Sequence, residues 1–251
     1  MAAPEPTTPG TRPAGTHDEQ SAALAVQEMF DRIAPRYDLL NHVLSLNIDR
    51  IWWRRTARRF RSILSRPEAQ VLDVCCGTGY MALALLRLRP KEGRPVLAAD
   101  FSHQMLIRGA ARLVSRGAIP FEADALHLPL PANSVDLITT AFGFRNLANY
   151  SNGLAEFHRV LRPGGELGIL DFSEPRGALG RLYSLYFRRV LPRVGSLLSG
   201  VSGAYEYLPS SVHRFPAPDE MLLTMRSAGF TQASWTPYNF GVAGLYRGAK
   251  R

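Results

Sequence analysis

The chain has 251 residues, of which 46% are hydrophobic and 20% charged, and these values exclude a wholly disordered chain, a collagen-like fibre and a coiled coil. Lysine and arginine outnumber the acidic residues by 30 to 21, which gives a net charge of +9. Such a charge favours nucleic acid or an anionic membrane as partner, although a solvated basic surface explains it equally well.

Residues 1–20 are expected to form a disordered tail, because their prolines, glycines and threonines cannot build a core. A helical pattern of apolar residues begins at Ala22 and is interrupted by Pro35. A second amphipathic stretch, Ile51–Leu64, interleaves apolar residues with arginines. We expect residues 21–66 to form helices that fold over a site as a lid.

From Pro67 onward, short apolar runs alternate with longer amphipathic segments. The predicted strands are Val71–Val74, Val96–Ala99, Pro120–Ala123, Val135–Phe142 and Leu167–Phe172, and the predicted helices are Met81–Leu88, His103–Ser115 and Ser151–Leu161. This alternation is typical of parallel strands with right-handed crossovers, and therefore of an α/β doubly wound sheet. A helix, Asp219–Ala228, and two apolar runs then predict a hairpin that closes the sheet with an antiparallel strand. Residues 21–251 are expected to form a single domain.

A glycine turn follows the first predicted strand. Gly77 and Gly79 let the backbone turn tightly and approach a ligand closely. Asp100 ends the second strand, where an acid can accept hydrogen bonds from both hydroxyls of a ribose. The third glycine of the dinucleotide fingerprint is replaced by Ala82, so a nucleoside without pyrophosphate, S-adenosylmethionine, fits better, with Asp73 near its amino group. A purely structural turn is the alternative.

Asp124 and Ala125 follow the third strand, where an acidic side chain could meet the adenine amino group. With the glycine turn and Asp100, they are the ordered marks of the class I methyltransferase fold, which the sequence resembles from residue 67 to about 248. The two cysteines, Cys75 and Cys76, are adjacent and lack the spacing of a zinc site, so no metal is expected. They indicate a reducing cytoplasm, and no secretory signal or transmembrane run is recognised.

Four segments go beyond the generic fold. They are Met29–Asn41, Phe142–Asn146, Leu170–Ser173 and Tyr205–Val212. Together they resemble the ubiquinone/menaquinone biosynthesis C-methyltransferase family over residues 26–250. The resemblance implies a Rossmann-like, mostly parallel seven-stranded sheet with helices on both faces and an antiparallel last strand. It also implies methylation of a prenylated quinol, either demethylmenaquinol or the ubiquinol precursor, with cofactor contacts from Thr78, Asp100, Asp124 and Ala125.

A ring carbon becomes nucleophilic when an ortho phenol loses its proton, so the site needs a proton acceptor and a positive or donor group beside the phenolate. Arg145 and Asn146 follow the fourth strand and are the expected catalytic residues. Arg145 is too basic to accept the proton itself, but a water that it holds could do so. The alternatives are a structural ion pair for Arg145 and a helix N-cap role for Asn146.

The expected substrate contacts are aromatic and polar residues in the lid and in an insert over the active site, residues 177–215. They are Tyr37, Asp38, Asn41, Tyr205 and Tyr207. The insert is rich in leucine, tyrosine and phenylalanine and could roof a tunnel for an isoprenoid tail. An ordinary core role is the alternative for each aromatic residue.

Several positions depart from the family pattern, and they indicate a divergent member. Tyr80 stands where an acid is usual, Ala141 where serine is usual and Asp171 where glutamate is commoner. The arginine-rich segments Ile51–Leu64 and Leu182–Leu191 could rest on anionic lipid at the inner face of the membrane, and a homodimer is also considered. A solvated basic face is the rival explanation.

Three other functions are weighed against this one. A methyltransferase for another lipid or small molecule, such as a phospholipid amine, would keep Thr78, Asp100 and Asp124 but would not need Arg145 and Asn146. The charge suggests an RNA methyltransferase, but the sequence shows no RNA-binding module and no Asn-Pro-Pro-Tyr motif, so nucleic acid is not an expected partner. A cofactor-binding fold without catalysis is the third alternative.

Overall fold

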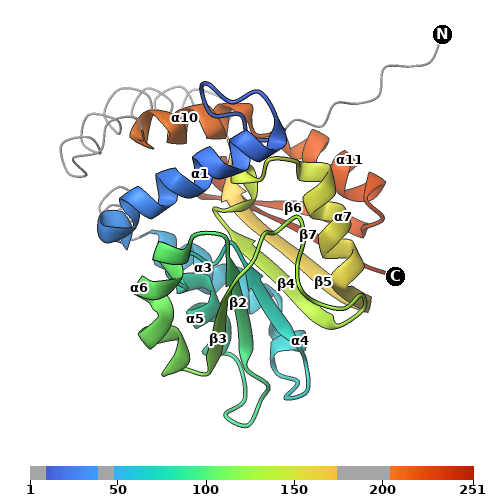
Figure 1. Cartoon of the computed structure of the whole chain (residues 1–251). Coiled ribbons are helices and arrows are strands. Elements are labelled where there is room, and N and C mark those ends of the chain that lie inside the picture. Colours follow the sequence, from blue (N-terminus) through green and yellow to red (C-terminus); the bar gives the residue numbers. More distant parts are fainter. Residues whose placement is uncertain (1–9, 39–47, 174–203) are drawn as a thin grey trace.

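The computed structural model describes residues 10–38, 48–173 and 204–251. In these residues one seven-stranded sheet has the order β3-β2-β1-β4-β5-β7-β6 (Figure 1). Its strands are β1 (Val71–Val74), β2 (Val96–Asp100), β3 (Ala118–Glu122), β4 (Val135–Ala141), β5 (Leu161–Phe172), β6 (Thr231–Tyr238) and β7 (Ala243–Ala249). Strands β1 to β5 are parallel, and β7 runs antiparallel between β5 and β6. The predicted fold class is confirmed.

The central strands are apolar because helices cover both faces of the sheet. All four residues of β1 are buried, and β4 is buried over most of its length. The parallel register places Asp73 beside Thr139, which makes a polar pair in the middle of the sheet. The Thr139 hydroxyl donates to Asp73 Oδ1 at 2.7 Å.

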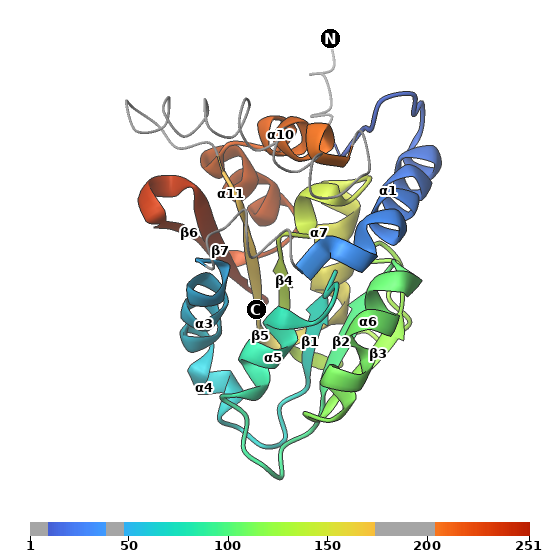
Figure 2. The same ribbon diagram turned by 90° about the vertical axis from the view of Figure 1, so that its left-hand side faces the viewer.

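Two layers of helices enclose the sheet (Figure 2). One layer holds α3 (Asp49–Arg59), α4 (Arg61–Leu64), α5 (Tyr80–Leu86) and α6 (His103–Val114), and the other holds α7 (Tyr150–Val160) and α11 (Pro218–Ser227). Each predicted crossover helix is observed within two residues of its predicted ends. Ser102 caps α6 through Met105 N, and Asn149 caps α7 through Asn152 N.

The N-terminal helix α1 (Glu19–Ile33) lies across the carboxyl ends of the parallel strands, with α10 (Ala204–Arg214) beside it (Figures 1 and 2). Asp18 caps α1 by accepting from Ser21 N, and η1 (Ala34–Arg36) follows with Pro35 in its first turn. The sequence prediction of disorder up to residue 20 is wrong for residues 10–20. Thr11 is 1% exposed, and its backbone N–H donates to Leu147 O at 2.8 Å.

The arginine-rich stretch in α3 and α4 is amphipathic as predicted, but its apolar face belongs to the core. Trp52, Trp53 and Phe60 are buried against the sheet layer, while Arg54 and Arg58 are exposed. The other arginine-rich segment, Leu182–Leu191, lies outside the described residues, as does most of the predicted insert. None of the helices within the described part of the chain has the length and apolar character needed to cross a membrane.

Candidate functional site

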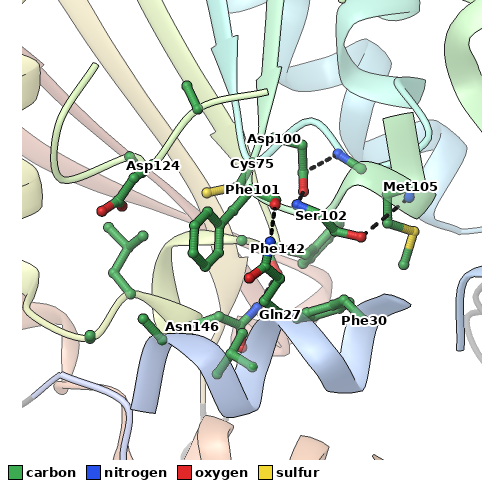
Figure 3. A pocket seen from close by; sticks show the side chains of 18 of the residues that line it. Gln27, Phe30, Cys75, Asp100, Phe101, Ser102, Met105, Asp124, Phe142 and Asn146 are labelled. Carbon is green, nitrogen blue, oxygen red and sulfur yellow. Dashed lines mark hydrogen bonds between the residues drawn. The ribbon is translucent and has the colours of Figure 1, made fainter. Parts of the chain in front are cut away.

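A pocket opens at the carboxyl ends of β1, β2 and β4, which is where ligands bind in open α/β sheets. The space between its walls is about 780 Å³ when the open solvent at its mouth is included. Residues from the turns after β1, β2, β3 and β4 form its floor and walls, and α1 forms its roof (Figure 3). Most of the lining is apolar, and a few carboxylates and amides interrupt it.

Two tight turns meet at the floor of the pocket. Cys75, after β1, and Phe142, after β4, have positive φ angles of 53° and 60°, which are uncommon for residues with a side chain. A Cβ on Gly143 would lie 2.3 Å from Cys75 Cβ, so only glycine lets these turns pack together. Gly79 has a φ of 91°, and a Cβ there would lie 2.4 Å from the Leu113 side chain. The glycine turn is therefore pressed closely against α6.

Asp100 is the carboxylate at the end of β2, and it lines the pocket as predicted. Its Oδ2 accepts from Gly77 N at 2.6 Å and its Oδ1 from Ser102 N at 2.8 Å, so both turns that flank the pocket fix its orientation. Burial raises the pKa of this carboxyl to about 6, although the backbone N–H groups oppose the shift. Asp100 is thus ionised above pH 6 and can accept further hydrogen bonds from a ligand.

Asp124 and Ala125 also line the pocket, on the wall that follows β3. Asp124 Oδ1 accepts from Leu126 N at 2.9 Å, and its Oδ2 lies 3.2 Å from His127 Nδ1. The turn after β3 therefore presents one carboxylate and one small buried side chain to the cavity. Gly77, in the turn after β1, also lines the pocket.

The three other predicted cofactor residues, Asp73, Thr78 and Gly79, do not line this pocket. Asp73 is fully buried, and burial raises the pKa of its carboxyl to about 7. The Thr78 hydroxyl donates to Asp38 Oδ1 at 2.6 Å. Asp38 also accepts from Arg112 at 3.4 Å and from the Tyr80 hydroxyl at 3.3 Å, so it joins the glycine turn to α6 instead of facing the cavity.

Helix α1 supplies residues that the sequence did not single out, among them Gln27 and Phe30. Gln27 Nε2 donates to Phe101 O at 2.9 Å, and Asp31 Oδ1 accepts from the Ser102 hydroxyl at 2.5 Å. These bonds attach the roof to the turn that carries Asp100. The sequence led us to expect a helical lid over a site in this segment, but it did not identify Gln27 or Phe30 as lining residues.

Arg145 and Asn146 lie in η2 (Phe144–Asn146), directly after β4. Asn146 lines the pocket, and Asn149 is the N-cap of α7, so the alternative role for Asn146 does not apply. Arg145 does not line the pocket, and it forms the structural ion pair that was the alternative to its expected catalytic role. Its NH1 lies 2.8 Å from Asp171 Oδ1 and also donates to Phe142 O, and its buried Nε has no hydrogen-bond partner among the described residues.

The predicted substrate contacts fall into two groups. Tyr37 lines the pocket, and Tyr207 contacts the pocket wall by donating to Asn146 Oδ1 at 3.0 Å. Asn41 and the side chain of Tyr205 lie outside the described residues. Among the residues that the structure does describe, no group of three or more histidine, cysteine or acidic side chains is arranged to hold a metal ion.

Comparison of the amino-acid sequence with known proteins finds enzymes that are similar over most of the chain. A profile described as the ubiE/COQ5 methyltransferase family matches residues 16–250. A demethylmenaquinone methyltransferase of Deinococcus radiodurans is 47% identical, over 93% of this chain and 96% of its own length. A ubiquinone/menaquinone biosynthesis C-methyltransferase UbiE of Geotalea daltonii is 43% identical, over 90% of this chain and 96% of its own length.

Solved structures share the fold at low sequence identity. A SAM-dependent methyltransferase from Aquifex aeolicus superposes with a TM-score of 0.56 at 19% identity, over 77% of this chain and 88% of that one. The cyclase SpnF superposes with a TM-score of 0.64 at 18% identity, over 96% of this chain and 98% of that one. One of these neighbours is a cyclase, which shows that the fold alone does not decide the reaction.

Proposed function

The chain belongs to the ubiE/COQ5 methyltransferase family and is an S-adenosylmethionine-dependent methyltransferase of quinone biosynthesis, and we propose that its substrate is the prenylated quinol demethylmenaquinol. The choice of quinol rests on the relative at 47% identity, whose name specifies demethylmenaquinone. The ubiquinol precursor is the competing substrate, since the relative at 43% identity is named for both quinones. The pocket with Asp100 at the end of β2 is the observation that carries the assignment of the site.

The residues around the pocket fit the cofactor. Asp100 is ionised at neutral pH, fixed by two backbone donors and open to the cavity, which suits the paired hydroxyls of a ribose. Asp124 and Ala125 would border the adenine, and the apolar side chains of α1 would cover it. Asp73 is fully buried and does not line the pocket, so we propose no direct contact between Asp73 and the cofactor. S-adenosylmethionine supplies an electrophilic methyl group when it is bound.

The chain's own residues orient the quinol and stabilise its phenolate. Asn146 presents its amide to the cavity, and Tyr37 lies beside the glycine turn on the roof side. Arg145 does not line the pocket, and Asp171 already balances its guanidinium, so we propose no direct contact between Arg145 and the quinol. A hydrogen bond from the Asn146 amide can hold the phenolate oxygen. The apolar roof excludes bulk water from the ring.

Contact with an anionic membrane is part of the proposal, because a prenylated quinol resides in the bilayer. The apolar face of α3 and α4 is buried in the core, so these helices cannot insert that face into a membrane. Its exposed arginines remain, and each Lys or Arg near an anionic surface contributes about 1 kcal/mol. The proposed contact is therefore electrostatic and places the protein at the cytoplasmic face of the membrane.

The experiment that tests the substrate is methyl transfer from isotopically labelled S-adenosylmethionine to a panel of chemically reduced quinones. Demethylmenaquinol should gain one methyl on a ring carbon, located by mass spectrometry. A methoxybenzoquinol with a matched prenyl tail should react at least tenfold more slowly. Equal or faster methylation of the benzoquinol contradicts the proposed substrate, and methylation on oxygen contradicts the proposed reaction.

A further inference from the structure

Residues 10–12 form a strap, here called the N-terminal strap, which lies on the pocket wall formed by residues 146–148. Thr11 N donates to Leu147 O at 2.8 Å, and Arg12 NH1 donates to Ala148 O at 2.8 Å. A Cβ on Gly10 would lie only 1.8 Å from Ala148 O, so the strap passes the wall at a distance that only glycine permits. Asn146, Leu147 and Ala148 all line the pocket.

A chain of side-chain hydrogen bonds runs from the strap into the pocket. Thr11 Oγ1 lies 2.7 Å from the Tyr207 hydroxyl, and that hydroxyl donates to Asn146 Oδ1 at 3.0 Å. The orientation of the Asn146 amide follows from its other contact, because Nδ2 donates to Phe142 O at 3.4 Å. Burial raises the pKa of the Tyr207 phenol, so its proton remains in place at neutral pH. A phenol has one proton, which goes to Asn146, and Thr11 must therefore be the donor to Tyr207.

We infer that Thr11 is a positioning residue, which acts through Tyr207 to fix the orientation of the Asn146 side-chain amide. In this orientation the amide oxygen of Asn146 faces Tyr207, and one N–H of Nδ2 is available to a ligand oxygen. Nδ2 carries two N–H groups, and the bond to Phe142 O uses one of them. The role of that second N–H toward the phenolate oxygen of a quinol rests on the proposed function. The hydrogen-bonded chain itself does not, because it depends on the folded protein alone.

The chain of hydrogen bonds from Thr11 to Asn146 is buried at both ends. Thr11 is 1% exposed and Asn146 is 8% exposed, so water replaces a lost partner poorly at both ends. Three segments meet there, the strap, α10 and η2, and Arg214 of α10 donates to Arg12 O beside them. Residues that a composition-based prediction assigns to a disordered tail thus complete the wall of the site.

The test replaces the Thr11 hydroxyl with a methyl group of similar shape in the full chain. Thr11→Val should lower kcat on demethylmenaquinol about fivefold, the effect expected from losing one neutral hydrogen bond, with little change in the Kd of S-adenosylhomocysteine. Thr11→Ser keeps the donor and should restore kcat. Thr16→Val is the matched control, because within the part of the chain that the structure describes the Thr16 hydroxyl donates to Pro13 O of the same segment alone.

A second measurement needs no substrate. The side-chain amide resonances of Asn146, assigned by their loss in Asn146→Asp, should shift in Thr11→Val and stay in place in Thr11→Ser and Thr16→Val. Unshifted resonances in Thr11→Val, or equal effects of Thr11→Val and Thr16→Val, overturn the inference. If the amide shifts as expected but no quinol is methylated by the unmodified protein, the proposed function fails while the positioning role stands.

Discussion

Asp100 contributes to the pocket as an acceptor that the fold has already oriented. Asp100→Asn puts an amide N–H against one of two backbone donors, Gly77 N or Ser102 N, and removes the charge that strengthens a bond from a ribose hydroxyl. We expect the Kd of S-adenosylhomocysteine to rise about 10- to 100-fold, the effect of losing one charged hydrogen bond. Calorimetric titration measures it. Glu122→Gln, an exposed carboxylate on the neighbouring strand, is the control and should bind normally.

The same residue predicts a pH dependence of cofactor binding. With a pKa of about 6, Asp100 is ionised at pH 7 and becomes protonated below pH 6, where it loses acceptor capacity. Affinity should therefore fall as the pH drops from 7 to 5, by about tenfold per unit below the pKa. Asp100→Asn should lack this component. Identical pH profiles for the two proteins would show that another group controls binding.

Burial of Asp73 leads us to expect that the stability of the protein falls as the pH rises, whereas a salt-bridged acid would make it rise. The pKa of Asp73 rises from 3.8 to about 7 on folding because the carboxyl is buried, so the folded state binds more protons between these values. The free energy of unfolding must then fall as the pH rises through this window. In Asp73→Asn the part of this fall that Asp73 contributes disappears, so between pH 5 and pH 8 the variant should gain about 2.5 kcal/mol of stability relative to the unmodified protein.

Urea denaturation at pH 5, 6, 7 and 8 measures the Asp73 effect. At pH 5 the side chain at position 73 is neutral in the folded form of both proteins, so the difference in stability measured there is the reference from which its growth with pH is counted. A difference between the two proteins that stays constant with pH would mean that Asp73 is not the titrating group.

The residues of helix α1 roof the pocket, so we expect this helix to move when a bound cofactor leaves. Asp31 holds it through the Ser102 hydroxyl at 2.5 Å and Gln104 N at 3.3 Å. Asp31→Ala should raise the dissociation rate of S-adenosylhomocysteine about tenfold, because a charged hydrogen bond contributes about 1.5–3 kcal/mol. Stopped-flow displacement measures this rate.

Glu28→Ala is the control on the same helix, because Glu28 is exposed and its side chain pairs with Arg32, one turn away at 4.0 Å. It should leave the dissociation rate unchanged. An Asp31→Ala protein that releases the ligand at the unmodified rate would show that α1 does not limit release.

For the whole molecule, the sheet was predictable because buried parallel strands form continuous apolar runs between glycine and proline residues. Asp100, Asp124 and Asn146 were predictable as pocket residues because each follows a strand at the same edge of the sheet. The ion-pair partner of Arg145 was not predictable, because Asp171 lies 26 positions later in the sequence and comes near through the pairing of β4 with β5. The role of Thr11 was not predictable, because its contacts are with residues far along the chain and its own segment has no periodic pattern of apolar residues.

The charge distribution over the whole molecule leads to the last prediction. The protein carries a net charge of +9, and α3 presents a face of exposed arginines. Binding to vesicles that contain anionic lipid should weaken as salt rises, because the attraction is screened beyond a Debye length of about 10 Å at 0.1 M. Arg54→Glu with Arg58→Glu should reduce vesicle binding at least tenfold. Arg116→Glu with Arg226→Glu makes the same change in net charge at exposed sites elsewhere and should have a smaller effect. Equal losses in the two double variants would mean that net charge, and not the face of α3, governs the contact.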